Sequence, residues 1–128
     1  MTSILFVCVG NACRSQMAEG FARALGPKDL AVYSAGSHPA GFVAREAITA
    51  MREKGIDISR HYSKGIDELP KIDFDYLVTM GCGDDCPMIP ARRRLDWQIP
   101  DPIGRGKDYF CQIRDLVETK VKALVEDF

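Results

Sequence analysis

The stretch FVCVGNACRSQMAEGF, residues 6–21, decides the fold, because an apolar run meets a turn and then a helix without a linker. Residues 4–8 are uniformly apolar, which is typical of a strand buried on both faces. From Ser15 onward the apolar residues recur at helical spacing, until Gly26-Pro27 ends the pattern. A buried strand that leads directly into a helix is the opening of a βαβ unit. The stretch therefore predicts an α/β fold with a parallel sheet.

The remainder of the chain continues this alternation. Further strands are predicted at residues 30–35, 74–80 and 95–99, and helices at 43–51, 63–69 and 110–124. Right-handed crossovers then place helices on both faces of the sheet. No repeat or linker interrupts the pattern, so we expect a single domain over residues 1–128, with an irregular loop at 81–90.

Composition excludes several classes of partner. The chain has 128 residues, 17 of them basic and 18 acidic, so its net charge of -1 favours neither nucleic acid nor an acidic membrane surface. The one basic cluster, Arg92 to Arg94, is interpreted as the solvated end of a strand. No apolar run approaches the roughly 20 residues that span a bilayer. The first ten residues also lack the basic segment of a signal peptide, so we expect a cytoplasmic protein.

The cysteines point to chemistry rather than to a disulfide framework. An odd number of them in a cytoplasmic protein argues against structural disulfides. Zinc fits poorly, because a structural site needs four ligands and only one close pair lies outside the first loop. The histidines, His38 and His61, stand alone in the sequence. We therefore predict no metal site. The five cysteines are Cys8, Cys13, Cys82, Cys86 and Cys111.

The loop between the first strand and the first helix can bind an anion. Successive backbone amides in such a loop form a nest, and the helix N-terminus adds positive charge. Gly10 and Asn11 suit the positive φ that a tight nest requires, and Arg14 can grip two oxygens of an oxyanion. Nearby arginine and a helix N-terminus favour the thiolate of a cysteine. The predicted oxyanion-binding residues are Val9, Gly10, Asn11, Ala12, Cys13 and Arg14.

Cys8 is the predicted nucleophile of this loop. It would attack the bound oxyanion as a thiolate that accepts a hydrogen bond from Ser15. The alternative is that Cys8 merely ends a buried strand, but the six-residue step to Arg14 followed by Ser15 is far more specific. Cys13, by contrast, is assigned a structural role. The loop lacks GxxxxGK[ST], which argues against a nucleotide substrate.

Three chemistry-bearing positions follow predicted strands. Cys8 ends the first strand, Cys82 follows the third and Asp101 follows the fourth. The carboxyl ends of parallel strands meet at one edge of the sheet, where ligands of open α/β sheets bind. We therefore expect these three side chains to lie near one another.

Cys8 to Ser15 resembles the CX5R(S/T) signature of the low-molecular-weight protein tyrosine phosphatases. The extension CxxNxCRSQMAEGF is more similar to the arsenate reductases built on the same fold. Further matches are Ser34-Ala35-Gly36, residues 55–59, the strand at 77–80 with its cysteine loop, and Asp101-Pro102. The resemblance implies four parallel strands in the order 2-1-3-4. It also implies Cys8 as nucleophile, Arg14 as oxyanion clamp, Ser15 as thiolate partner, Asn11 as the residue that shapes the loop and Asp101 as general acid.

Two activities remain open on this resemblance. Arsenate reduction needs two electrons, which Cys82 and Cys86 would supply through a disulfide relay with Cys8. A phosphatase acting through a Cys8 phosphocysteine is the alternative. The phosphatases usually carry aromatic residues after Asp-Pro, whereas Ile103 and Gly104 follow here. This difference favours the reductase. A non-catalytic oxyanion or redox sensor is a third possibility.

The expected partners follow from the same resemblance. The substrate would be a small oxyanion, with arsenate as substrate and phosphate or sulfate as its analogues. Thioredoxin would restore the thiols, or a glutaredoxin or small-thiol system, since Cys82 and Cys86 are spaced more closely than in the thioredoxin-linked enzymes. Some relatives bind potassium with residues matching Asn11, Glu19, Ser34 and an aspartate. Lys64 stands at that last position, so no metal or cofactor is expected.

Overall fold

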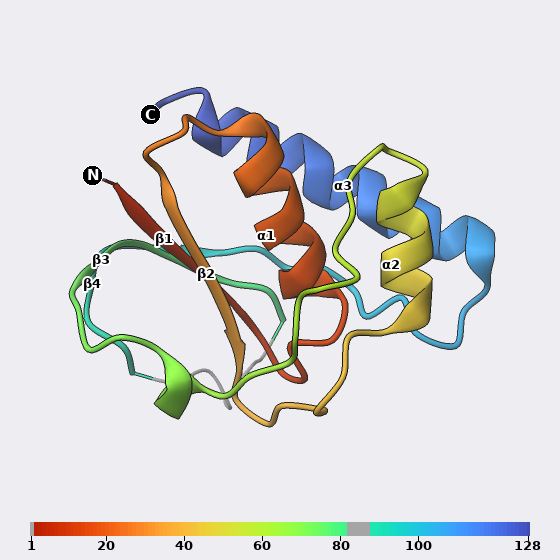
Figure 1. Cartoon of the computed structure of the whole chain (residues 1–128), viewed down its shortest axis with the longest axis horizontal. Coiled ribbons are helices and arrows are strands. Elements are labelled where there is room, and N and C mark those ends of the chain that lie inside the picture. Colours follow the sequence, from red (N-terminus) through yellow and green to blue (C-terminus); the bar gives the residue numbers. More distant parts are fainter. Residues whose placement is uncertain (1, 82–87) are drawn as a thin grey trace.

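The computed structural model describes residues 2–81 and 88–128, so the predicted relay pair Cys82 and Cys86 lies outside the described residues. Figure 1 shows the path of the chain. The elements are, in order, β1 (Ser3–Cys8), α1 (Arg14–Leu25), β2 (Ala31–Gly36), α2 (Arg45–Arg52), the 3₁₀ turn η1 (Ile66–Glu68), β3 (Phe74–Thr79), β4 (Ala91–Asp96) and α3 (Lys107–Val125).

The sheet confirms the predicted topology. Its four strands are all parallel and run in the order β2-β1-β3-β4. The central strand β1 is buried along its whole length, as its uniformly apolar sequence predicts. Cys8, its last residue, pairs with Gly36 of β2, and Val7 pairs with Thr79 of β3. The nucleophile predicted from sequence therefore stands at the carboxyl edge between two neighbouring strand ends.

Helices cover the two faces of the sheet unequally in the described residues, with the α-helices on one face and the 3₁₀ helix η1 on the other. The three α-helices contact one another and share a single core with one face of the sheet (Figure 1). The other face has a smaller core of strand residues, such as Leu5 and Leu77, covered by η1 and loop segments. The predicted helix at 63–69 shrinks to the three-residue η1, because Pro70 lacks the amide and disfavours a helical residue before it.

The fourth strand was predicted too far along the chain. It covers Ala91–Asp96 rather than 95–99, and the arginine run lies within the strand instead of at its end. Arg93 pairs with Tyr76 of β3 and lies with its guanidinium 6.0 Å from that ring. An edge strand pairs with a neighbour on one side only, and such strands commonly carry charged side chains. Periodicity missed the strand because most of its side chains are exposed.

The remaining boundaries shift by a few residues at most. α1 begins at Arg14, and α3 begins three residues earlier than predicted, at Lys107. Such differences are ordinary for element ends. None of the helices that the structure describes is both long and apolar enough to cross a bilayer.

Candidate functional site

The Cys8 sulfur lies at the base of the loop between β1 and α1. The residue is only 2% exposed, and its Sγ lies 2.9 Å from the Ser15 hydroxyl oxygen. Ser15, in the first turn of α1, is itself fully buried. The short loop between β1 and α1 thus brings the side chains of Cys8 and Ser15 into contact, as the sequence motif predicts.

The carbonyl groups of the loop between β1 and α1 point toward the segment that follows β2. The amides of residues 37, 38, 40 and 44 donate to the main-chain oxygens of residues 8, 9, 10 and 12, at 2.8 to 3.2 Å. Because C=O and N–H of one peptide plane point in opposite directions, the amides of residues 9, 10, 11 and 13 face away from that segment. This is the arrangement that an anion nest requires.

Two backbone features let the loop close so tightly. Asn11 has φ of 48°, a positive value that asparagine tolerates better than most residues. A Cβ placed on Gly36 would lie 2.5 Å from the Val9 oxygen and 2.9 Å from the Asn11 nitrogen. Gly36, the last residue of β2, therefore permits a close approach between the end of that strand and the loop.

The side chain of Asn11 joins the loop to β2. Its Nδ2 donates to Ser15 Oγ at 2.8 Å and to Ser34 Oγ at 3.0 Å. Ser34 donates in turn to a carboxylate oxygen of Glu19 at 2.5 Å. All four residues are at most 5% exposed, so this network excludes water from the back of the loop and holds its shape.

Arg14 is held by the main chain of two strand ends. Its Nη1 donates to the oxygen of Met80, after β3, and to that of Ile99, after β4. The residue is 8% exposed, and its Nε is buried with no hydrogen-bond partner among the described residues. A buried N–H without a partner is rare and costly, and here it belongs to a cation beside a nest of amides. Both facts favour an oxyanion at this place.

Asp101 lies close enough to act on the loop electrostatically. Burial raises the pKa of the Cys13 thiol to about 12, and the charges of Cys8 and Asp101 add to that effect. The Asp101 carboxylate is exposed and accepts a hydrogen bond from the Ile103 amide at 3.1 Å. Cys8 and Ser15 thus lie in contact at the carboxyl edge of the sheet beside Arg14, Asp101 is near enough to act on Cys13 electrostatically, and Cys13 is a buried thiol with a raised pKa.

Lys64 lies against Glu19, one of the residues that the resemblance matches to a potassium site. Its Nζ lies 3.9 Å from a carboxylate oxygen of Glu19 and donates to the Tyr62 oxygen at 3.2 Å. Burial lowers its pKa, while Glu19 opposes that shift. An ammonium against the carboxylate leaves no role for a second cation, so these residues do not fit potassium. Elsewhere in the described parts of the chain, no group of three or more acidic, cysteine or histidine side chains could hold a metal.

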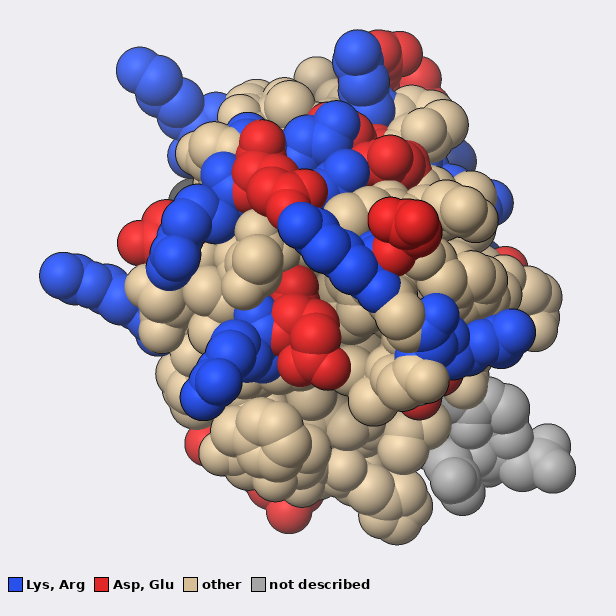
Figure 2. Space-filling view, turned by 90° about the vertical axis from the view of Figure 1, so that its right-hand side faces the viewer, with Lys and Arg blue, Asp and Glu red and all other residues tan. Residues whose placement is uncertain are grey.

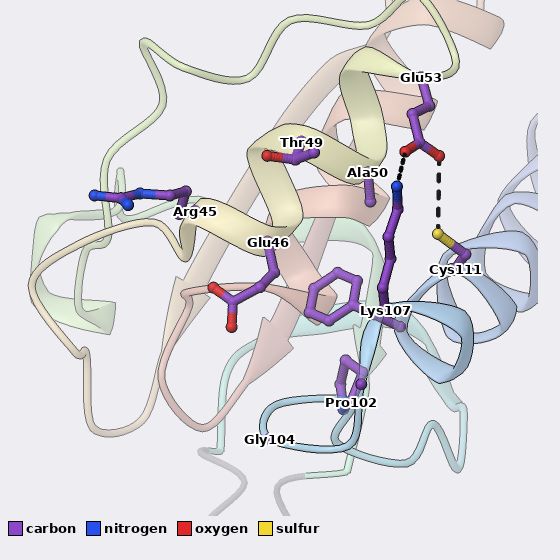
Figure 3. Close-up of a pocket in the computed structure, with 11 residues that line it drawn as sticks. Arg45, Glu46, Thr49, Ala50, Glu53, Pro102, Gly104, Lys107 and Cys111 are labelled. Atoms are coloured by element: carbon purple, nitrogen blue, oxygen red, sulfur yellow. Dashed lines mark hydrogen bonds and ion pairs between the residues drawn. The ribbon is translucent and has the colours of Figure 1, made fainter.

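A cavity of about 360 Å³ lies beside α2 and the start of α3 (Figure 3). Pro102 lines it, so it adjoins the Asp101 loop. One cysteine, Cys111, lines the cavity, and its Sγ lies 3.8 Å from Glu53 Oε1. The other carboxylate oxygen of Glu53 lies 3.3 Å from Lys107 Nζ. The Cys111 thiol thus faces a carboxylate, whereas the Cys8 sulfur lies beside a hydroxyl at the base of the loop between β1 and α1.

The face of the molecule that Figure 2 presents carries charges of both signs. Figure 2 shows lysine and arginine side chains interspersed with aspartate and glutamate over the face that it presents. The small net charge of the chain agrees with this distribution.

Sequence reasoning missed three residues of the site. Gln16 donates to the Asn11 side chain at 2.9 Å, although its position in α1 looked unremarkable. Gly81, with φ of 89°, lies directly against the Arg14 guanidinium. His61 was treated as isolated, yet its Nδ1 lies 3.1 Å from Gln16 Oε1. Only the match of Ser15-Gln16-Met17 to the reductase motif could have indicated Gln16. The roles of Gly81 and His61 depend on contacts between distant segments.

Comparison with known proteins agrees with this geometry. The profile of the family described as low molecular weight phosphotyrosine protein phosphatase matches residues 3–128. Arsenate reductase 2 of Staphylococcus saprophyticus is 40% identical over 98% of this chain and 97% of its own. The glutaredoxin arsenate reductase of Synechocystis is 39% identical over 98% and 97%. A solved structure described as an arsenate reductase in the phosphate binding state has a TM-score of 0.89 at 38% identity, covering 99% of this chain and 98% of that one.

Proposed function

Because the chain belongs to the low-molecular-weight phosphotyrosine protein phosphatase family, and its similar relatives include arsenate reductases, we propose that it reduces arsenate to arsenite. One observation carries the chemistry. The Cys8 sulfur lies 2.9 Å from the Ser15 hydroxyl oxygen, in a loop whose Arg14 keeps a buried Nε with no hydrogen-bond partner among the described residues.

The first step is attack of the Cys8 thiolate on the arsenic of bound arsenate. The loop amides and Arg14 hold the oxyanion and stabilise the charge that builds up on its oxygens. An S–As bond forms and an As–O bond breaks. Asp101 donates the proton with which the leaving oxygen departs as water.

The second step supplies the electrons. The Cys82 thiolate attacks the Cys8 sulfur, the S–As bond breaks, and its electron pair leaves with arsenic as arsenite. Two thiols are thereby oxidised to a Cys8–Cys82 disulfide while As(V) becomes As(III). Cys86 then attacks Cys82, frees Cys8 and leaves a Cys82–Cys86 disulfide, which an external dithiol reduces by exchange.

We assign the reductant to the thioredoxin class, with glutaredoxin as the other dithiol source, and the reaction to the cytoplasm, where thiols stay reduced. The relative from Synechocystis carries glutaredoxin in its name, so the two reductants are compared directly in the assay. Equal turnover with a small thiol alone would contradict a protein reductant.

A phosphatase would share the first step and then use water in place of the second thiol. The family description names phosphotyrosine, yet Ile103 and Gly104 follow Asp101-Pro102 where an aromatic residue would stack on the substrate ring. We therefore expect hydrolysis of aryl phosphates to be a weak side reaction that does not depend on Cys82.

The decisive experiment is arsenite release under multiple turnover with thioredoxin, its reductase and NADPH. Cys8→Ser should release none, and Cys82→Ser should lose sustained turnover. Cys111→Ser, which removes a thiol outside the loop, should match the wild type. Full turnover by Cys82→Ser would refute the reductase. Mass mapping of the oxidised protein should show a Cys82–Cys86 bond; a Cys8–Cys82 bond alone would exclude Cys86 from the relay.

A further inference from the structure

We propose that Gln16 and His61 are positioning residues that fix the direction of the hydrogen bond between Ser15 and Cys8. The chain of contacts runs from His61 through Gln16 and Asn11 to Ser15. The proposal rests on the proposed function only in taking Cys8 as the nucleophile.

The orientation of the Gln16 amide is set by main-chain oxygens. Its Nε2 lies 2.9 Å from the oxygen of Tyr62 and 3.2 Å from that of Asn11. Carbonyl oxygens only accept, so the group that faces them is the NH₂. Gln16 is 0% exposed, and water therefore does not compete for these bonds.

The Asn11 amide is oriented by two donors. Gln16 Nε2 donates to its Oδ1 at 2.9 Å, and the main-chain amide of Lys64 does so at 3.0 Å. With Oδ1 occupied in this way, the NH₂ of Asn11 faces the hydroxyls of Ser15 and Ser34. Both hydroxyls are acceptors in these bonds.

The direction of the last bond follows. Ser15 Oγ accepts from Asn11, so its own proton is free for the Cys8 sulfur 2.9 Å away. A donated hydrogen bond stabilises the thiolate over the thiol. If the Asn11 amide turned over, its oxygen would draw the Ser15 proton away from Cys8, and the thiolate would lose that support.

His61 completes the arrangement from outside the loop. With the NH₂ of Gln16 facing Tyr62, its Oε1 faces His61 Nδ1 at 3.1 Å, so that nitrogen carries the proton. Burial lowers the pKa of His61, with Arg23 and Lys64 acting in the same direction and Glu19 and Asp57 opposing it. The ring is therefore neutral at physiological pH and donates through Nδ1.

The test is the pH profile of Cys8 alkylation by iodoacetamide, followed on the Cys8 peptide by mass spectrometry. We expect Gln16→Met to raise the inflection by about one pH unit, a tenfold loss of thiolate below it. His61→Leu should raise it by about half as much. His61→Asn places an amide N–H near the position of Nδ1 and should restore the wild-type profile.

A control separates positioning from lost stability. Val117→Ala opens a cavity in the core under α3, at a residue outside the hydrogen-bonded chain from His61 to Ser15, and should lower the melting temperature with the inflection unchanged. The proposal is overturned if neither Gln16→Met nor His61→Leu moves the inflection, or if Val117→Ala moves it equally. If Gln16→Met does not fold, the His61 pair decides. Alkylation needs no arsenate, so this result is independent of the proposed activity.

Discussion

Arg14 Nη1 donates a 2.9 Å hydrogen bond to the main-chain oxygen of Met80, so a neutral carbonyl holds the guanidinium in place. Arg14 forms no ion pair among the described residues. The buried carboxylate of Glu19, for example, pairs with Arg23 and Lys64 instead. The positive charge of Arg14 is therefore left for an anion. The position of Arg14 depends on the backbone that follows β3, and the first prediction concerns that backbone.

Gly81→Ala should weaken oxyanion binding. Gly81 has φ of 89°, and a Cβ there would collide with Arg14 Nη1. We expect the strained backbone to cost about 1–3 kcal/mol of stability, and the displaced guanidinium to lower kcat/KM by roughly tenfold or more. Steady-state arsenite release and phosphate inhibition measure this.

Gly55→Ala is the matched control for that substitution. Gly55 has φ of 74°, but a Cβ there would meet nothing within 4 Å. Stability should fall while kcat/KM stays at the wild-type value. Equal loss of activity in both variants would show that Arg14 is not the cause.

Cys13 should be unreactive in the folded protein. Its thiol is 5% exposed, and burial raises its pKa to about 12. At pH about 8 the thiolate fraction is then near one in ten thousand. Peptide mapping after mild alkylation should find Cys13 unmodified, and Cys13→Ala should keep turnover. Labelling of Cys13 at the rate of a free thiol would contradict the structure.

Lys64 should make turnover independent of potassium. Wild-type activity is expected to be equal in potassium chloride and in tetramethylammonium chloride at the same ionic strength, because the ammonium already lies against Glu19. Lys64→Asp removes that cation and adds a carboxylate, so potassium should raise its activity and its melting temperature. A wild type that requires potassium would show that the ammonium does not replace the ion.

Glu53 should contribute to the acid sensitivity of the fold. Hydrogen bonds from Arg114 and then Lys107 hold its pKa below the ordinary value of 4.5. A carboxyl with a lowered folded-state pKa stabilises the protein above its unfolded pKa, and this stability is lost as the pH falls further. The free energy of unfolding, measured in urea by the fluorescence of the single tryptophan, Trp97, should therefore fall below pH 4.5.

The matching variant is Glu53→Gln, which should flatten that dependence. Glu46→Gln removes a carboxylate from α2, the helix that Glu53 follows directly, and Glu46 is not a partner of Arg114 or Lys107 in the described structure. It should keep the wild-type slope. An unchanged slope in Glu53→Gln would exclude the carboxylate as the cause.

The strand–loop–helix unit around Cys8 is predictable from sequence because each of its signals is local. An apolar run, a glycine-containing turn and the spacing from Cys8 to Arg14 all lie within a dozen residues. Contacts such as His61 with Gln16 join segments 45 residues apart, and no local pattern encodes them. The fourth strand ends at Asp96 rather than at residue 99, so Asp101 still follows a strand end although the bounds of the strand differ from those predicted.

The unequal distribution of helices over the two faces of the sheet is also not encoded locally. A crossover rule gives the hand of each connection, but it does not guarantee that the connecting segment forms a helix. The segment between α2 and β3 contains only η1. The roles of Cys82 and Cys86, which lie outside the described residues, stay predictions on the resemblance.

The arginines of β4 also bear on how the protein behaves in concentrated solution. Arg92, Arg93 and Arg94 are all exposed along the outer strand of the sheet. A second copy that tried to extend the sheet there would bring like charges together in register, which costs free energy at each pair. The three arginines that kept β4 from showing an apolar pattern thus also disfavour aggregation through this strand.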